Sequence, residues 1–359
     1  MFLKEIINSL ADPKWFISLS AVLFFLTVPR ASLWTGRNIV IVFVAMTAFF
    51  LVSMRDPNFF LVVTKADNIP IVGMLFMCVF FLWFSLWQAK RNDEIVASGR
   101  DLRESIESNK KVFVWPDLLY IEFICILILT VVLVVWSIVI PAPLEEPATP
   151  TDAPNPSKAP WYFLGLQEML VYYDPWLAGV VFPGLIILGL MAIPYLDKNP
   201  KGNGYYTYKE RPFAILTFNF GFLILWVLLI ILGTFLRGPN WNFFGPYEYW
   251  DLHKLEPLVN VNLSELIWVK LLNTGLPKNW FIREIFGIGI VIAYFTALPP
   301  LFAKKSAFFR KLLDEMGTVR FYFMIFLFLL MIALPIKMFL RWTMNLKYIV
   351  GIPEFFFNI

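Results

Sequence analysis

The chain is dominated by uninterrupted apolar runs, and their length restricts the folds that it can adopt. Runs of roughly 17–25 residues match the hydrocarbon core of a bilayer, which is about 30 Å thick. Hydrophobic residues make up 59% of the 359 residues and the mean hydropathy is +0.69, which is too apolar for one water-soluble domain to bury. The sequence therefore predicts an all-α, polytopic transmembrane protein with about eight spans.

The distribution of basic residues predicts how these spans are oriented. The expected spans cover residues 13–29, 38–54, 69–89, 117–140, 177–196, 213–236, 284–303 and 320–342. If the spans alternate in direction, the connections richest in Lys and Arg all fall on one side, at 30–37, 90–111, 198–211 and 304–320. Because cytoplasmic connections carry an excess of Lys and Arg, we expect that side to be cytoplasmic and both termini to face outward. A bacterial inner (cytoplasmic) membrane is the expected location.

The scarcity of Cys and His limits the cofactors that the chain can hold by itself. Cys78 and Cys125 both fall inside expected spans, so a disulfide framework or a Cys-rich metal site is excluded. His253 is the single histidine and lies in an expected outward loop, so the chain cannot supply the paired axial histidines of a b-type haem. We therefore expect this chain alone to bind neither a metal ion nor haem.

Two expected outward loops differ in composition. The loop 141–176 begins with many prolines, which predicts an extended first half, and its second half, 161–172, is compatible with a short helix. Glu168 lies in that predicted helix. The loop 237–283 is rich in aromatic residues, which favours two interpretations: a belt at the membrane–water interface or a docking surface.

Five short motifs lie between residues 115 and 214. They are Trp115-Pro116-Asp117-Leu118-Leu119-Tyr120, Glu146-Pro147-Ala148, Pro160-Trp161-Tyr162-Phe163, Ile193-Pro194-Tyr195-Leu196 and Arg211-Pro212-Phe213-Ala214. In this order and spacing they resemble the C-terminal part of cytochrome b, and most closely subunit IV of the cytochrome b6f complex.

The resemblance implies an outer quinol site around Trp161 and Tyr162. In the family this loop reads Pro-Glu-Trp-Tyr, and its glutamate accepts a proton from quinol. Here Pro160, which has no titratable group, occupies the position of the glutamate, and Glu168 is the candidate to replace it. A carboxyl in an apolar pocket would have a raised pKa, as suits a general base. The other interpretations are that Glu168 lies on the outer surface and that Tyr162 is an interfacial anchor.

The resemblance also implies an inner quinone site on the cytoplasmic side, with Asp117 and Arg211 as its candidate residues. Each has a second interpretation. Asp117 is an acidic residue in the first turn of an expected helix, where the helix dipole favours it, and Arg211 fits the excess of cytoplasmic basic residues. Glu122 lies inside a span, where a carboxylate serves either a proton path or a contact with a neighbouring subunit.

Together these expectations describe a membrane subunit organised in four blocks. Residues 1–90 form a three-span extension, 91–116 a polar cytoplasmic helix or linker, 117–236 the three-span part similar to cytochrome b, and 237–359 an aromatic loop with two further spans. The resemblance implies a haem-free subunit of a quinol:electron-acceptor oxidoreductase. Its substrate is quinol, and its partners are a haem-bearing subunit like the N-terminal part of cytochrome b, a Rieske iron–sulfur protein, a c-type cytochrome and the lipid bilayer. No nucleic acid is expected.

Two other functions compete with this one. A structural scaffold of a redox supercomplex, without quinol chemistry, is favoured by Pro160 and by the spans without a counterpart in the family. A transporter is disfavoured because the chain lacks paired broken spans in repeated halves.

Overall fold

The computed structural model describes residues 2–107, 110–140, 147, 149–151, 153–197, 206–257, 259–352 and 355–359. Seven helices in this part of the chain are long and apolar enough to cross a membrane, and an eighth span results if the bent pair α1 and α2 is counted as one. The prediction of a polytopic helical membrane protein is confirmed.

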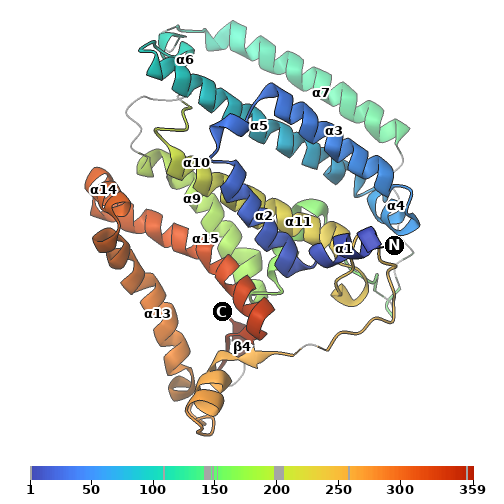
Figure 1. Ribbon diagram of the computed structural model, residues 1–359, viewed down its shortest axis with the longest axis vertical. Helices are drawn as coiled ribbons and strands as arrows, with labels where there is room; N and C mark the ends of the chain where they lie inside the picture. Colours follow the sequence, from blue (N-terminus) through green and yellow to red (C-terminus); the bar gives the residue numbers. More distant parts are fainter. Residues whose placement is uncertain are drawn as a thin grey trace. The chain divides into compact units, whose positions relative to one another are not determined.

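The seven long helices follow the expected spans closely, with small shifts at their ends. They cover Gly36–Ser53, Ile69–Ala97, Val114–Val139, Leu177–Leu196, Pro212–Leu236, Trp280–Lys305 and Thr318–Met344. The helices (Figure 1) are α1 (Phe2–Leu10), α2 (Pro13–Thr27), η1 (Ala31–Leu33), α3 (Gly36–Ser53), α4 (Pro57–Val63), α5 (Ile69–Ala97), α6 (Arg103–Glu107), η2 (Val114–Leu118), α7 (Leu119–Val139), η3 (Trp161–Phe163), α8 (Leu164–Met169), η4 (Leu177–Val181), α9 (Phe182–Leu196), α10 (Pro212–Asn219), η5 (Phe220–Val227), α11 (Leu228–Ile231), η6 (Leu232–Leu236), η7 (Pro239–Trp241), α12 (Leu263–Glu265), η8 (Leu266–Leu271), α13 (Trp280–Lys305), α14 (Ala307–Met316) and α15 (Thr318–Met344).

Polar residues at the helix starts explain where several helices begin. The side chain of Asp56 accepts hydrogen bonds from the backbone N–H groups of Asn58 and Phe59 at the start of α4. Asn279 and Ser306 cap α13 and α14 in the same way. Such caps satisfy backbone donors that have no partner inside the helix.

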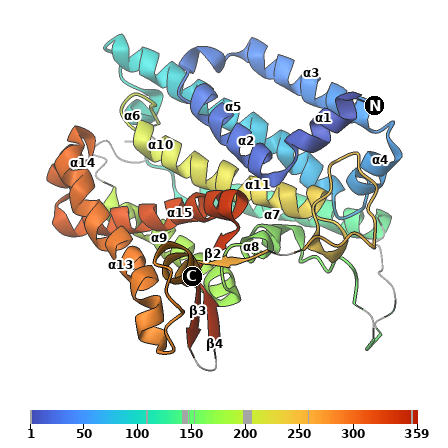
Figure 2. The ribbon, with the colours of Figure 1, turned by 60° about the horizontal axis from the view of Figure 1, so that its bottom comes forward.

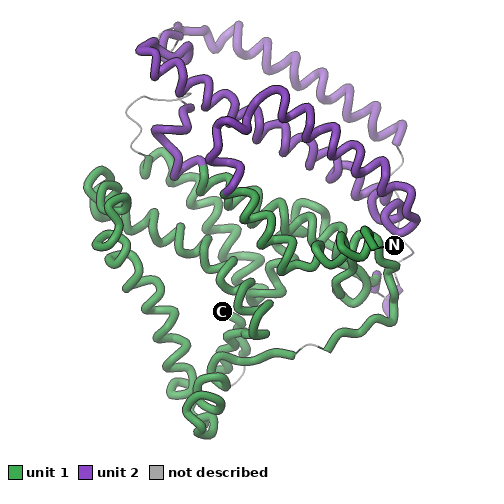
Figure 3. Tube along the Cα trace, viewed as in Figure 1, with its two compact units in different colours: residues 1–25, 155–200, 216–359 green, residues 26–154, 201–215 purple. Residues whose placement is uncertain are grey.

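The chain divides into two compact units (Figure 3), each described here by itself. Unit 1 comprises residues 1–25, 155–200 and 216–359, and unit 2 comprises residues 26–154 and 201–215. The four blocks expected from the sequence remain a prediction.

In unit 1, α13, α14 and α15 follow one another along the chain, and the short α14 connects the two long helices α13 and α15 (Figure 1). Their core contains Ala303 of α13 and Phe321, Ile325 and Leu329 of α15, with apolar residues of α14 packed against it. The hydroxyl of Tyr294 donates to the backbone oxygen of Leu329 at 2.7 Å, which ties α13 to α15.

Four short strands accompany the helices of unit 1, which the all-α expectation did not include. β1 (Val261–Asn262) pairs in parallel with β2 (Leu346–Lys347). β3 (Ile349–Ile352) and β4 (Phe355–Asn358) form an antiparallel pair near the C-terminus, shown in Figure 2. The β1–β2 pair attaches the end of α15 to the segment that precedes α12.

In unit 2, α5 continues beyond the apolar run to Ala97, so the polar residues 91–97 belong to a long helix. The stretch 91–116, expected to be a polar cytoplasmic helix or linker, includes the end of α5, the five-residue α6 and the start of the next span. The end of α5 is held by the segment before α10: the Asn92 side chain donates to the Tyr206 carbonyl at 2.9 Å, and the Asp93 carboxylate accepts from the Lys209 backbone.

Candidate functional site

The proline-rich segment ends in a turn that exposes three aromatic side chains. Pro160 is extended, and its carbonyl accepts from the Phe163 backbone N–H at 2.8 Å, which closes the turn η3. Trp161, Tyr162 and Phe163 are 39%, 49% and 51% exposed, and neighbouring rings lie 5.7 Å and 4.7 Å apart between centroids. The turn therefore presents a continuous aromatic surface, which we call the aromatic turn.

Polar contacts fix the aromatic turn to the rest of unit 1. The Gln167 amide oxygen accepts from the Ala159 backbone at 2.8 Å, and its nitrogen donates to the Ser157 carbonyl at 2.9 Å. The Lys158 ammonium donates to the Thr234 carbonyl at 2.8 Å. Because these contacts reach both α8 and η6, the position of the turn is set by helices on either side of it.

Helix α8 approaches the span Pro212–Leu236 closely, because glycines lie at the contact. A Cβ on Gly233 would lie 3.4 Å from the carbonyl oxygen of Leu164, and a Cβ on Gly165 would lie 3.5 Å from the Trp226 carbonyl oxygen. Leu164 is buried in this contact. A polar group on this inner side of α8 costs free energy unless it is hydrogen-bonded.

Glu168 is on that inner side, and its partner is Arg237. The carboxylate of Glu168 has no exposed surface, and the Arg237 side chain is 12% exposed. The Arg237 Nη2 lies 2.6 Å from Oε1, and its Nε lies 3.3 Å from Oε1 and 3.1 Å from Oε2. Such a two-pronged contact is the geometry in which a guanidinium binds a carboxylate most strongly. We call these two residues the buried ion pair.

The segment after the span holds Arg237 in place. Its Nη1 donates to the Trp241 carbonyl at 3.1 Å, and the Phe244 backbone donates to the Leu236 carbonyl at 2.9 Å. Burial alone would lower the pKa of Arg237, but the Glu168 carboxylate outweighs it, so the pKa of the guanidinium is raised. Arg237 therefore stays charged.

The buried tyrosine Tyr172 lies near the same pair. Its hydroxyl accepts from the Trp342 ring nitrogen at 3.2 Å, and burial together with the Glu168 charge raises its pKa. The Asn358 side chain donates to the Tyr172 carbonyl at 3.0 Å, and the Asp174 backbone donates to the Asn358 carbonyl at 2.8 Å. The C-terminal strand β4 thus closes the loop that follows α8.

The structure separates residues that the sequence analysis groups into one outer quinol site. Trp161 and Tyr162 lie at the surface of unit 1, whereas Glu168 faces inward, so Glu168 does not decorate the outer surface. Asp117 is exposed at the start of the span Val114–Val139, and Arg211 is half-buried just before α10; both belong to unit 2. Of the second motif, Glu146 and Ala148 lie outside the described residues.

Arg237 was not among the site residues predicted from the sequence. Its position could have pointed to it, because Arg237 is a basic residue directly after the apolar run 213–236, on the expected outer side of the membrane, where few basic residues are expected.

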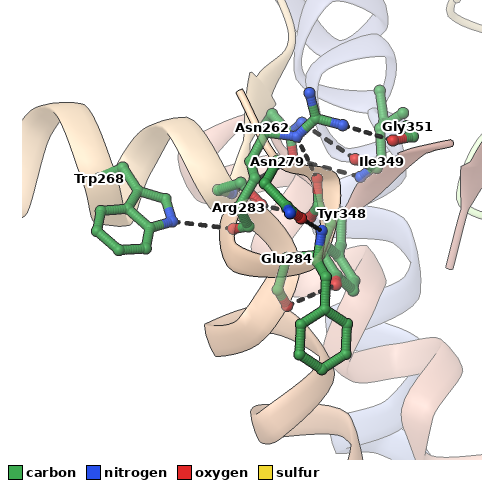
Figure 4. A network of polar contacts seen from close by, with 10 residues as sticks. Asn262, Trp268, Asn279, Arg283, Glu284, Tyr348, Ile349 and Gly351 are labelled. Carbon is green, nitrogen blue, oxygen red and sulfur yellow. Dashed lines mark hydrogen bonds and ion pairs between the residues drawn. The ribbon is translucent and has the colours of Figure 1, made fainter. Parts of the chain in front are cut away.

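A second buried carboxylate, Glu284, lies near the start of α13 (Figure 4). The Ser264 hydroxyl donates to its Oε2 at 2.6 Å, and the Arg283 Nε donates to its Oε1 at 2.8 Å. Arg283 also donates to the Gly351 carbonyl at 2.5 Å, and the Tyr348 hydroxyl reaches the Glu284 carbonyl at 3.4 Å. This network joins α12, α13 and β3, and its contacts are internal. Within the described residues, no group of three or more His, Cys, Asp or Glu side chains is arranged to hold a metal ion.

Comparison with known proteins supports the resemblance found from the motifs. Residues 147–247 match the family described as cytochrome b (C-terminal)/b6/petD. A menaquinol:cytochrome c reductase cytochrome c subunit from Geobacillus thermodenitrificans is 31% identical over 105 residues, which are 28% of this chain and 40% of that protein. The chain thus spans about two fifths of the relative it matches. No solved structure matches the chain significantly.

The resemblance to the C-terminal part of cytochrome b is therefore confirmed for residues 147–247. This segment contains the aromatic turn, Glu168 and Arg237, and it extends past the end of the motifs at Ala214. The first motif and Asp117 precede it. With seven apolar helices in the described part, the chain is an integral membrane protein.

Proposed function

We propose that this chain is a membrane subunit of a quinol:electron-acceptor oxidoreductase of the cytochrome bc type, in which it forms part of the outer quinol-oxidation pocket. One observation carries the proposal: the matched segment places an exposed aromatic turn directly before a helix whose inner face holds a buried, charge-compensated carboxylate. Aromatic and apolar walls with few polar groups are typical of sites for apolar ligands.

The proposed partners are those that the resemblance to cytochrome b implies. Oxidation of quinol to quinone releases two electrons and two protons, and this chain has one histidine, too few for the paired axial ligands of a b-type haem. In the proposal the electron acceptors are on other subunits: a haem-bearing subunit like the N-terminal part of cytochrome b, a Rieske protein and a c-type cytochrome. Menaquinol, named for the relative, is the first quinol to test. A bacterial inner membrane with both termini outward completes the proposal.

In this proposal Pro160, Trp161 and Tyr162 form the pocket wall, and the Tyr162 hydroxyl hydrogen-bonds the quinol head group. Glu168 accepts the proton from quinol. Because its carboxylate is bound by Arg237, it can do so only if that contact opens. Asp117 and Arg211 contribute to the inner quinone site, where quinone is reduced again.

The experiment compares three variants in the purified complex: Glu168→Gln, Arg237→Gln and the double variant. Glu168→Gln alone leaves a buried arginine without its counter-charge, so a loss of turnover in it could come from misfolding. The double variant leaves no buried charge. If Glu168 is the proton acceptor, the double variant assembles but oxidises menaquinol far more slowly than the wild-type complex. Wild-type turnover in the double variant removes Glu168 from the proton transfer.

A structural scaffold without quinol chemistry is the second candidate, and Pro160 at the position of the family's glutamate favours it. Photo-crosslinking with a derivatised inhibitor of quinol oxidation separates the two candidates. A pocket subunit is labelled at residues 160–170, and free menaquinol competes with the labelling. A scaffold copurifies with the complex but is not labelled there.

A further inference from the structure

The first helix, α1, is amphipathic, and its apolar side is uncovered. Phe2, Leu3, Ile6 and Leu10 follow helical spacing along one side of it and are 76%, 69%, 39% and 45% exposed. These four residues are called the apolar side of α1. A stripe of this kind is normally buried, so something outside the described chain covers it.

The orientation of α1 follows from its angle to α2. The two helices are bent by 78° at the break between Leu10 and Pro13. Residues 15–28 carry no charge and Lys14 and Arg30 flank them, and residues 13–29 are the first span expected from the sequence, with basic residues at its two ends. Because spanning helices tilt by only about 20° on average, a helix at this angle lies close to the membrane plane.

The polar side of α1 is held by the protein. The Asn8 side-chain oxygen accepts from the Tyr247 backbone at 3.0 Å, and the Lys4 ammonium lies 5.6 Å from the centre of the Tyr247 ring. Gly245 packs so closely that a Cβ there would lie 2.5 Å from the Asn8 side chain. These contacts fix the rotation of α1 about its axis, so its apolar side faces away from the loop 245–247.

We propose that α1 binds the lipid surface, lying in the interface with its apolar side among the upper acyl chains. The lipid is the favoured occupant because α2, the next helix, also exposes large apolar side chains, including Trp15, Leu19 and Leu23, which a bilayer would cover. Lys4 and Glu5 cancel in charge, so the binding is hydrophobic and does not require anionic lipid. The membrane thereby anchors the loop segment that begins at Arg237.

The test uses the full chain in lipid nanodiscs, with Cys78 and Cys125 replaced by alanine. One cysteine is introduced at Ile6 on the apolar side or at Glu5 on the polar side, and an environment-sensitive fluorophore is attached. Lipids brominated near the head group serve as quenchers. We expect the label at position 6 to be blue-shifted and quenched several-fold more than the label at position 5, equally in phosphatidylcholine and in mixtures with phosphatidylglycerol.

Three outcomes overturn the proposal. Equal quenching at both positions means that α1 does not lie with one side in lipid. A shielded label at position 6 that brominated lipid does not quench means that protein covers it. Quenching only with phosphatidylglycerol means that charge, and not apolar burial, drives the contact.

The role of the Asn8 contact is tested separately. Gly245→Ala places a methyl group against Asn8, so it is expected to reduce the difference between positions 5 and 6. Gly275→Ala, in the same outward loop with no atom within 4 Å of the added carbon, is the matched control and should leave the difference unchanged. An unchanged difference in Gly245→Ala shows that the loop does not set the rotation of α1.

Discussion

Replacing Arg237 by glutamine leaves the Glu168 carboxylate buried without its counter-charge. The carboxylate has no exposed surface and accepts three contacts of 2.6–3.3 Å from the guanidinium. Removing one partner of a buried ion pair typically costs about 3–5 kcal/mol, because the remaining charge is not solvated. We expect Arg237→Gln, and equally Glu168→Gln, to lower the free energy of unfolding by about this amount.

The double variant decides whether the loss comes from the uncompensated charge. Two glutamines leave no buried charge and can hydrogen-bond each other, so the double variant should be more stable than either single variant. The measurement is unfolding in mixed micelles of mild detergent and sodium dodecyl sulfate, followed by tryptophan fluorescence. The double-mutant cycle should give a coupling energy of at least about 1 kcal/mol.

An exposed ion pair supplies the matched control. Glu315 lies 3.7 Å from Lys311 on α14, and both side chains are more than half exposed. Glu315→Gln should therefore change the free energy of unfolding by less than about 0.5 kcal/mol. The reasoning is refuted if Arg237→Gln is as mild as this control, or if the two single losses simply add in the double variant.

Three further predictions concern the network of Figure 4, all measured by the same unfolding assay. Gly287→Ala would place a Cβ 2.3 Å from the Tyr348 ring and should lower the free energy of unfolding by about 1–3 kcal/mol. Gly289→Ala, with no atom within 4 Å of the added carbon, is the control and should be neutral or stabilising by up to about 1 kcal/mol. Equal effects of the two substitutions would contradict the close contact between Gly287 and Tyr348. Ser264→Ala removes the donor to Glu284 at 2.6 Å and should cost about 1–3 kcal/mol, and no loss would show that the carboxylate finds another donor. Burial, together with the Glu284 charge, raises the pKa of Tyr348 to about 12, whereas a tyrosine in the unfolded chain has a pKa of about 10. The neutral Tyr348 side chain therefore stabilises the fold below pH 10, and this stabilisation is lost as the pH rises towards 12. The Tyr348→Phe variant should lose less stability than the wild type between pH 10 and 12, and identical pH profiles would show that Tyr348 does not cause the loss.

Much of the site could be predicted because its motif is local in the chain. The aromatic turn follows from Pro160 and the three aromatic residues after it, and the short helix after the turn was expected from composition. The direction of Glu168 could not be predicted. It depends on how α8 rotates against the span Pro212–Leu236, and Gly233, one of the two glycines that permit this contact, is far from Glu168 in sequence.

The amino-acid sequence alone predicts that the chain is a helical membrane protein and where most of its spans lie. A span is specified locally, because each apolar run must be long enough to cross the hydrocarbon core whatever its neighbours do. The burial of Glu168 and its pairing with Arg237, 69 residues further along the chain, became visible only in the folded protein. Neither periodicity nor composition encodes which charges meet across such a distance, since that depends on the packing of helices already formed.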